Sequence, residues 1–458
     1  MYACGKVCTF GSKNETTRML IYTPQITNRF RYVAELLMEE LIGIPLEITD
    51  NIDTYLSHHG LKLNYSKRRL SDEEIFIYTQ GLLFEKGIKT QQVAVGTYKE
   101  IAVLFPCTVE NVSLPFDIFA ASFYLVSRYE EYLPFTPDRH NRYQVEDSIA
   151  YKADFLHLPV VNIWANFLRE ICKEKQPDIR CKQRSYKFLP TYDIDLAYSY
   201  KHKGFMRNLG RCLIYLKDGK WEETSELLKV WLFNAPDPYD TYSLQTKLHQ
   251  QHKLHATYFF LIGEYSRYDK NISIENLAYQ KLIRDLADNN KVGIHPSYRS
   301  NKDPKILHNE IEKLSAIIKT EVERSRQHYI KLRIPQTYET LLSNEIYKDY
   351  SMGYASAVGF RAGIASAFYF YNINLEIKTD LRVYPFCIMD VTLKEYLQLK
   401  PQKAQKLIYK LIEQVRKVNG LFIFIWHNHT ISDYDDWQGW QQVYINTLEK
   451  ALAVRPID

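Results

Sequence analysis

The sequence predicts an α/β protein in which a smaller N-terminal domain precedes a parallel sheet, open or closed into a barrel. Three observations support this fold class. Strand-like and helix-like runs alternate along most of the chain, capping residues stand at the ends of helical runs, and polar residues follow apolar strands. Strands that alternate with helices favour parallel pairing, because each helix returns the chain to the end where the next strand begins.

The N-terminal region alternates short strands with amphipathic helices. Strands are predicted at residues 19–24, 45–49, 74–80 and 100–107, and helices at 29–43, 117–133 and 159–172. The charged, pattern-free segment 173–184 is the predicted domain boundary. It separates an N-terminal α/β domain (19–172) from a second domain (185–458), and residues 1–18 are expected to be a disordered or non-native tail.

The second half of the chain alternates more regularly. Strands are predicted at 186–194, 255–263, 291–297, 328–334, 382–389 and 420–428, and helices at 275–290, 304–320, 337–349 and 401–420. Asp303 and Pro304 supply an N-cap and a first-turn proline, and Gly420 follows the last of these helices as a C-terminal cap would. The insertion at 204–243 is expected to be helical and peripheral.

Composition excludes several classes of partner. The formal net charge is +5 over 458 residues without a dense block of Lys and Arg, so nucleic acid is not an expected partner. Seven scattered cysteines favour reduced thiols over a disulfide framework. No apolar run reaches the length of a membrane span or of a signal-peptide core, so a cytoplasmic location is expected. The oligomeric state stays open.

Polar side chains close three of the predicted strands. Asp193 and Asp195 end the first, His295 ends the third, and His427 and His429 end the last. Residues two apart in a strand share a face, so each pair can lie side by side. Two carboxylates this close resist joint ionisation unless a cation lies between them. One acid and an imidazole could therefore hold a divalent metal, which leaves the other acid as a base.

Several stretches resemble the motifs of the polysaccharide deacetylases of the NodB-homology type, carbohydrate esterase family 4: TYDIDLA, GIHPSY, SRQHY, KDYSMGYASAVGFRAG and FIWHN. The resemblance covers residues from about 186 to the C-terminus and implies a distorted (β/α) barrel. The N-terminal part is similar to an uncharacterised accessory domain that accompanies such deacetylases in bacteria. By this resemblance Asp193 is the general base, Asp195 and His295 are metal ligands, Arg326 orients the base, and His427 is the general acid.

The implied cofactor is a divalent metal, zinc or else cobalt or nickel. The family usually has a second metal histidine four residues after the first, a position that Arg299 occupies here. His328 and His429 are the candidates for a third ligand, unless metal binding is weak or absent. The candidate substrate contacts are Tyr298, Asp349, Arg361 and Trp426.

Structural roles compete with some of these assignments. Arg326 lies near a charged helix end, where a surface salt bridge is as plausible as orientation of a base. Asp349 could bond to the backbone of the turn that follows it. Arg361, between two glycines, could cap a helix instead of contacting substrate.

The resemblance implies metal-dependent hydrolysis of N-acetyl groups on the sugars of a polysaccharide or glycan precursor. Arg299 favours a contrary hypothesis, a catalytically inactive barrel that binds glycan or serves as a scaffold. A third hypothesis is hydrolysis of another non-peptide C–N bond. The metal discriminates between them, because a deacetylase must hold a divalent ion and a binding protein need not.

Overall fold

The computed structural model describes residues 18–453 and contains two compact units. The first comprises the described chain up to Glu85, Val93–Ala121 and Trp164–Arg184. The second comprises Lys86–Gln92, Ser122–Ile163 and the chain from Ser185 on. Two segments that the predicted division at 173–184 assigns to the N-terminal domain therefore belong to the second compact unit. The predicted tail lies outside the described residues, apart from its last residue.

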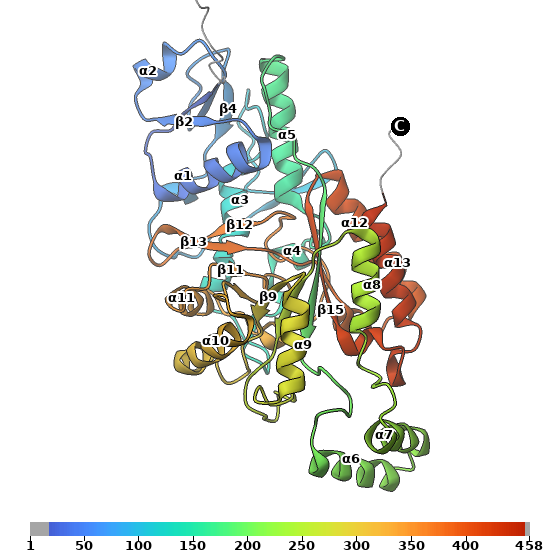
Figure 1. Ribbon diagram of the computed structural model, residues 1–458. Coiled ribbons are helices and arrows are strands. Elements are labelled where there is room, and N and C mark those ends of the chain that lie inside the picture. Colours follow the sequence, from blue (N-terminus) through green and yellow to red (C-terminus); the bar gives the residue numbers. More distant parts are fainter. Residues whose placement is uncertain (1–17, 454–458) are drawn as a thin grey trace, which may run out of the picture. The chain divides into compact units, whose positions relative to one another are not determined.

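The first unit is built on a four-stranded parallel sheet of order β2-β1-β3-β4 (Figure 1). Its strands are β1 Met19–Tyr22, β2 Leu46–Thr49, β3 Lys62–Ser66 and β4 Ile75–Tyr78. Helix α1 (Asn28–Ala34) begins at Thr27, whose hydroxyl accepts a hydrogen bond from the Phe30 amide, and continues as a π-helix to Ile42. A short helix α2 (Ile52–Leu56) and an antiparallel pair, β5 Val95–Tyr98 and β6 Ile101–Leu104, complete this unit.

The second unit contains a nine-stranded, mostly parallel sheet of order β12-β13-β11-β10-β9-β8-β7-β15-β14. Its strands are β7 Lys187–Ile194, β8 Thr257–Phe260, β9 Lys291–Ile294, β10 Arg324–Ser325, β11 Lys348–Asp349, β12 Phe368–Asn372, β13 Ile377–Val383, β14 Ile388–Met389 and β15 Leu421–His427. Within this nine-stranded sheet, only β12 and β13 pair antiparallel. The prediction of a parallel α/β sheet is confirmed.

The register of the parallel strands brings their polar ends together. β15 lies beside β7 with His427 opposite Asp193, and β8 and β9 follow in the same direction on the other side of β7. Because all these strands run parallel, the residues at their carboxyl ends meet at one edge of the sheet. That edge carries the candidate site.

Helices connect the strands of the second unit (Figure 1). They are α8 Tyr242–His252, α9 Leu277–Ala287, α10 Pro304–Ile318, α11 Gln336–Ser343 and α12 Pro401–Lys417, and α13 Trp440–Leu452 follows the last strand. Helices α3 (Ile118–Val126) and α5 (Val160–Lys175) run across the division between the units, and α4 (Ile149–Lys152) is a single turn. The predicted cap of α10 is confirmed, since the Asp303 carboxylate accepts from the Lys305 amide and Pro304 opens the helix.

Some elements differ from their prediction for identifiable reasons. The predicted strand 328–334 is wrong, because His328–Ile330 forms a 3₁₀ turn in which Tyr329 has φ 60°, and the strand β10 lies just before it. Strands β10, β11 and β14 have two residues each, too short for an alternation to be visible in the sequence. At the end of α12 the left-handed residue is Asn419, with φ 48°. Glycine is needed at position 420 for a steric reason instead, because a Cβ atom there would lie 2.7 Å from the Ala365 carbonyl oxygen.

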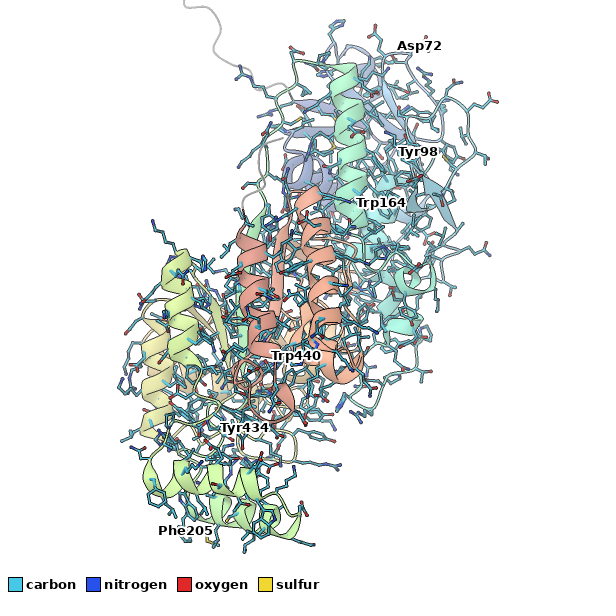
Figure 2. The ribbon with its side chains drawn as sticks, turned by 90° about the vertical axis from the view of Figure 1, so that its right-hand side faces the viewer. Asp72, Tyr98, Trp164, Phe205, Tyr434 and Trp440 are labelled. Atoms are coloured by element: carbon cyan, nitrogen blue, oxygen red, sulfur yellow. The ribbon has the colours of Figure 1, made fainter. Side chains whose placement is uncertain are left out.

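The insertion after β7 forms a helical hairpin, α6 (Phe205–Lys217) and α7 (Trp221–Phe233), as predicted. Figure 2 shows it at one end of the second unit, with Phe205 labelled on its outer side. No helix within residues 18–453 combines the length and the apolar character needed to cross a bilayer.

Candidate active site

A cavity of about 290 Å³ opens at the carboxyl edge of the large sheet. Strand β7 and the residue after it supply its two carboxylates, β9 and β15 lead into two of its histidines, and the turn after β10 supplies a third. The ionisable residues among those that line it are Asp193, Asp195, His295, His328, His427, His429, Arg142 and Lys270, together with Tyr268, Tyr329 and Tyr396.

Three side chains converge as a candidate metal site. Ligand atoms of Asp195, His295 and His328 all lie within 4.8 Å of one another. His295 Nε2 is 3.2 Å from Asp195 Oδ1, and His328 Nε2 is 3.6 Å from Asp195 Oδ2. One carboxylate with two imidazole nitrogens is a donor set that suits zinc and related divalent ions.

The two ring orientations leave nitrogen lone pairs facing Asp195. His295 Nδ1 lies 2.5 Å from the Arg326 carbonyl oxygen, and His328 Nδ1 lies 3.0 Å from Asp269 Oδ1. Carbonyl and carboxylate oxygens only accept, so Nδ1 carries the proton of each neutral ring and Nε2 is unprotonated. Asp269 is itself held by the Tyr298 amide. Such outer hydrogen bonds orient histidines that ligate metals.

Asp195 shows that the cluster fits a cation. Its Oδ1 is buried, and no described residue donates a hydrogen bond to it. With both rings neutral, the unprotonated Nε2 atoms of His295 and His328 would face the carboxylate oxygens of Asp195, and all of these atoms accept hydrogen bonds. A proton or a metal ion between them removes this repulsion. Burial alone would raise the pKa of Asp195, but His328 and His295 outweigh it and hold this pKa well below its usual range. Burial alone would lower the pKa of His328, yet Asp195 and Asp269 raise it to about 9.

Asp193 lies beside the cluster and is fixed by Arg326. The guanidinium Nη1 donates to Asp193 Oδ1 at 3.1 Å and to the Thr191 hydroxyl at 2.7 Å, and Nε donates to the Tyr350 carbonyl at 3.0 Å. Arg326 is fully buried and Asp193 nearly so. The surface salt bridge considered for Arg326 is therefore not its environment, and the guanidinium sets the direction of one Asp193 oxygen.

His427 faces the cluster from β15. Its Nδ1 is 2.8 Å from Asp390 Oδ1, its amide donates to Asp390 Oδ2 at 2.7 Å, and its Nε2 lies 3.6 Å from Asp195 Oδ2. Burial would lower the pKa of His427, but Asp390 overrides this and the pKa rises to about 10. A buried carboxylate behind Nδ1 fixes the tautomer and leaves Nε2 directed at the cavity.

His429 and Arg299 take different places. His429 lines the cavity but does not belong to the three-residue cluster, and its Nδ1 has no partner among the described residues. Burial, with His427 as a second cause, lowers its pKa to about 4.

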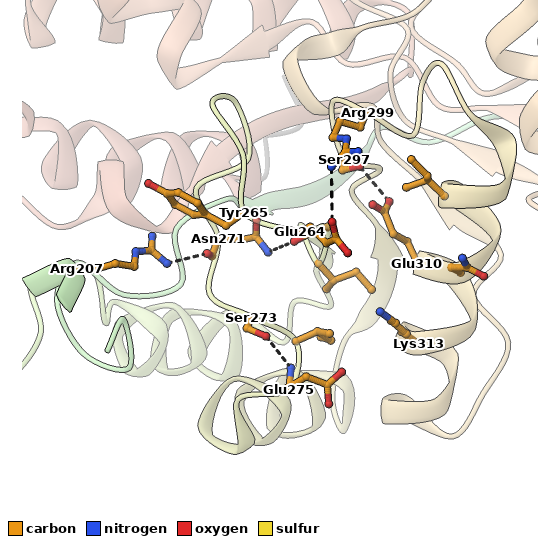
Figure 3. A pocket seen from close by; sticks show the side chains of 15 residues that line it. Arg207, Glu264, Tyr265, Asn271, Ser273, Glu275, Ser297, Arg299, Glu310 and Lys313 are labelled. Carbon is orange, nitrogen blue, oxygen red and sulfur yellow. Dashed lines mark hydrogen bonds and ion pairs between the residues drawn. The ribbon is translucent and has the colours of Figure 1, made fainter. Parts of the chain in front are cut away.

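Arg299 is exposed, and its Nη1 lies 3.6 Å from Glu264 Oε2. Figure 3 shows it in a second cavity of about 560 Å³, so its charge is carried away from the candidate metal site.

Among the described residues that line the smaller cavity, none is a predicted substrate contact. Tyr298 stacks behind Tyr268, with ring centroids 4.1 Å apart. Asp349 is buried and accepts from the Ser351 amide and hydroxyl, the turn role that was its alternative. Trp426 is fully buried and packs against Tyr444, because strand alternation turns it away from His427.

Arg361 belongs to a separate buried cluster. Its Nε and Nη2 donate to the two carboxylate oxygens of Glu131 at 2.9 and 2.6 Å, and its Nη1 donates to the Gly353 carbonyl. All its donor groups therefore serve the interior, and it neither caps a helix nor faces the smaller cavity.

Two supporting acids escaped the sequence analysis. Asp390 follows the predicted strand 382–389, so the rule that polar residues at strand ends mark a site could have found it. Asp269 lies in an irregular loop between β8 and α9, where no pattern distinguishes it from a turn residue.

Comparisons with known proteins give one family match over part of the chain and several matches to solved structures. Residues 19–177 match a family of unknown function (DUF7033). No curated protein matches the chain.

Solved structures match with low identity. Puue allantoinase has a TM-score of 0.38 and 9% identity and covers 58% of this chain and 84% of its own. A polysaccharide deacetylase from Bacillus cereus has a TM-score of 0.27 and 12% identity, with 59% and 86% covered. A pseudoenzyme of the CE4 family from Bacillus anthracis has a TM-score of 0.27 and 12% identity, with 58% and 62% covered. Values this low do not decide an activity.

Proposed function

We propose that the chain is a metal-dependent hydrolase that removes acetyl groups from N-acetylated sugars of a polysaccharide or glycan precursor. One observation carries the proposal. The candidate ligands Asp195, His295 and His328 share one cavity with an acid held by an arginine and a histidine held by an acid. The motif resemblance to polysaccharide deacetylases supports the same reaction, with the large sheet as the wall of a distorted (β/α) barrel.

The proposed metal ligands are Asp195, His295 and His328, so that His328 takes the part that the usual second histidine would have. When bound there, a divalent ion such as zinc, cobalt or nickel supplies Lewis acidity toward the carbonyl oxygen of an amide. With His427 protonated as an acid and the two ligand histidines neutral, the four carboxylates Asp193, Asp195, Asp269 and Asp390 and the two cations Arg326 and His427 give a formal charge of −2. A divalent cation offsets this excess.

Asp193 is the proposed general base. Because Arg326 binds its Oδ1, its other oxygen remains available to take a proton from an attacking water in the cavity. Arg326 acts through Asp193 and is therefore a positioning residue.

His427 is the proposed general acid. The proton for the leaving amine comes from Nε2, while Asp390 stabilises the positive ring through Nδ1. The contacts also indicate which residue is the base and which is the acid. The buried cation Arg326 lies behind Asp193, and the buried anion Asp390 lies behind His427. The aromatic wall of Tyr268, Tyr329 and Tyr396 is the proposed surface for the sugar ring.

Acetate release from N-acetylglucosamine oligomers tests the proposal. The wild type, loaded with zinc or cobalt, is compared with Asp193→Asn, His427→Ala and the matched control Arg299→Ala. We expect activity in the wild type and control and a loss on the order of a thousandfold in Asp193→Asn, with its metal content unchanged. A metal-loaded wild type that releases no acetate but binds the oligomers would contradict the proposal and favour a glycan-binding protein. Hydrolysis of other amides alone would favour another C–N hydrolase.

A further inference from the structure

The α6–α7 hairpin carries an unusual set of exposed apolar side chains. Eight large hydrophobic residues on it are exposed, more than in any other stretch of this length among the described residues. They are Phe205 (63% exposed), Met206 (75%), Leu213 (59%), Ile214 (58%), Leu216 (39%), Trp221 (69%), Leu232 (61%) and Phe233 (79%). Exposed apolar side chains in such number are typical of an interaction site.

The hairpin packs mainly through other side chains, although the Phe205 ring centroid lies 5.2 Å from that of Trp231 in α7. Its interior is a separate cluster of Tyr200, Cys212, Leu227 and Val230, against which Tyr215, Leu228 and Trp231 are partly buried. In α6 the exposed Phe205, Leu213 and Leu216 lie on one side of the helix, whereas Arg207, Arg211 and the exposed Ile214 lie on the other. Figure 2 shows Phe205 at the outer side of the hairpin. The exposed set is therefore available to a partner.

Positive charge is concentrated at α6 and the residues around it, whereas the hairpin as a whole, residues 205–233, has five cations and four acids, a net charge of +1. Residues 201–220 contain six cations, Lys201, Lys203, Arg207, Arg211, Lys217 and Lys220, and one acid, Asp218. Six minus one gives +5, which equals the formal net charge of all 458 residues. Helix α6 itself has three cations and no acid, whereas α7 carries three glutamates.

Contacts within the unit leave most of this charge uncompensated. Arg207 donates to the Lys270 and Asn271 carbonyl oxygens, and Arg211 donates to the Ser199 carbonyl, which are neutral partners. Two ion pairs within the hairpin are long and partly exposed, Lys220 with Glu223 at 3.7 Å and Lys229 with Glu226 at 3.9 Å.

We propose that the α6–α7 hairpin docks the protein on the surface of an anionic phospholipid bilayer. A basic amphipathic helix such as α6, with Phe, Met and Leu on its other face, is suited to lie in the interface, with its apolar side chains among the acyl chains and its cations near the headgroups. A second copy of the hairpin fits less well, because pairing through α6 would bring together two helices that each carry three cations and no acid. A docked hairpin needs no helix that spans the bilayer.

The hairpin is attached next to the candidate site. It follows β7, which carries Asp193, and the Tyr200 hydroxyl lies 3.0 Å from that of Tyr434 in the segment after β15. Arg207 also contacts the loop that contains Lys270, a residue of the cavity lining. Docking would therefore keep the cavity of the second unit close to the lipid surface. The proposal does not depend on the reaction at the site.

Vesicle flotation with the full chain tests this proposal. We expect at least about tenfold stronger binding to vesicles of phosphatidylglycerol and phosphatidylcholine than to phosphatidylcholine alone, and weaker binding in high salt. The double substitution Phe205→Ser with Phe233→Ser should lower binding by about tenfold for each side chain. Leu277→Ser is the matched control, because Leu277 on α9 is 76% exposed and lies outside the hairpin. Circular dichroism of each variant verifies the fold.

Three outcomes would overturn the proposal. The wild type could fail to bind the anionic vesicles, or the double variant could bind them as well as the control does. The third is a wild-type dimer in light scattering that the double variant dissociates, without binding to vesicles, which would assign the apolar face to a second copy of the chain.

Discussion

Two buried clusters of charge in the second unit differ in one respect. In the first, Arg128 binds Glu130 and Glu131, and Arg361 binds Glu131 through both carboxylate oxygens. Its two cations and two anions balance, and the remaining Glu130 oxygen accepts from the Ile149 amide. In the second, carboxylates outnumber cations around a cavity, and Asp195 Oδ1 has no hydrogen-bond donor among the described residues.

The difference separates a structural cluster from a candidate site. Burial and strong ion pairs occur in both, so neither property identifies function. What distinguishes the second cluster is an excess of negative charge directed at a cavity and unsatisfied within the chain. Arg361, a predicted substrate contact, belongs to the balanced cluster, whereas His328, one of two candidate ligands, belongs to the unbalanced one.

The largest expected effect on stability comes from the balanced cluster. Glu131→Gln should lower the free energy of unfolding by about 3–5 kcal/mol, because it leaves two buried guanidinium groups without a full counter-charge. Metal content should not change. Chemical denaturation gives the stability, and the control Glu323→Gln, in a partly exposed pair with Lys348, should cost less than about 1 kcal/mol. An equal cost for both substitutions would remove the distinction between buried and exposed pairs.

A smaller effect is expected when zinc is added. Free zinc at about 100 times its dissociation constant should stabilise the wild type by about 2.7 kcal/mol, because the folded chain alone has the assembled ligands. Thermal unfolding with and without zinc measures the shift. His328→Ala should lose it and Glu131→Gln should keep it. A shift that survives in His328→Ala would place the metal elsewhere.

The change of stability at acidic pH should distinguish the two charged clusters further. Burial tends to raise the pKa of Glu131, but Arg361 and Arg128 outweigh it and hold this pKa below the ordinary 4.5. A carboxyl group with a depressed folded pKa contributes fully above its unfolded pKa, and the contribution disappears as pH falls through the folded value. The stability difference between wild type and Glu131→Gln should therefore be constant near neutral pH and shrink below 4.5. Denaturation curves across this range measure it, and a difference that grows with acidity would contradict the assignment.

The smallest expected effect is that of Arg299→Ala. Because Arg299 is exposed beside Glu264 in the other cavity, its removal should change zinc affinity less than about twofold. Competition with a chromophoric chelator measures the affinity. A large gain in affinity would show that the arginine opposes metal binding, as the sequence alone suggests.

Much of the fold of the second unit was predictable from the alternation of strand-like and helix-like runs in the sequence. The parallel sheet, the strands that carry Asp193, His295 and His427, and the cap of α10 follow from periodicity and local chemistry. Trp426 illustrates the same rule, since its position one residue from His427 places it on the opposite, buried face.

Other features depend on long-range packing that a local pattern does not encode. His328 could not be separated from His429, because a two-residue strand and a turn with positive φ present it and neither leaves a periodic signal. Arg361 meets Glu131 across 230 residues of sequence. The basic character of α6 was also missed, because apolar residues separate its cations and no dense block forms.

Metal content of the purified protein tests the central claim most directly. Elemental analysis after zinc loading and dialysis is applied to the wild type, His328→Ala and His429→Ala. We predict about one divalent ion per chain in the wild type and in His429→Ala, and close to none in His328→Ala. A wild type without metal, or a His328→Ala variant that keeps the ion while His429→Ala loses it, would contradict the assignment of Asp195, His295 and His328 as the ligands.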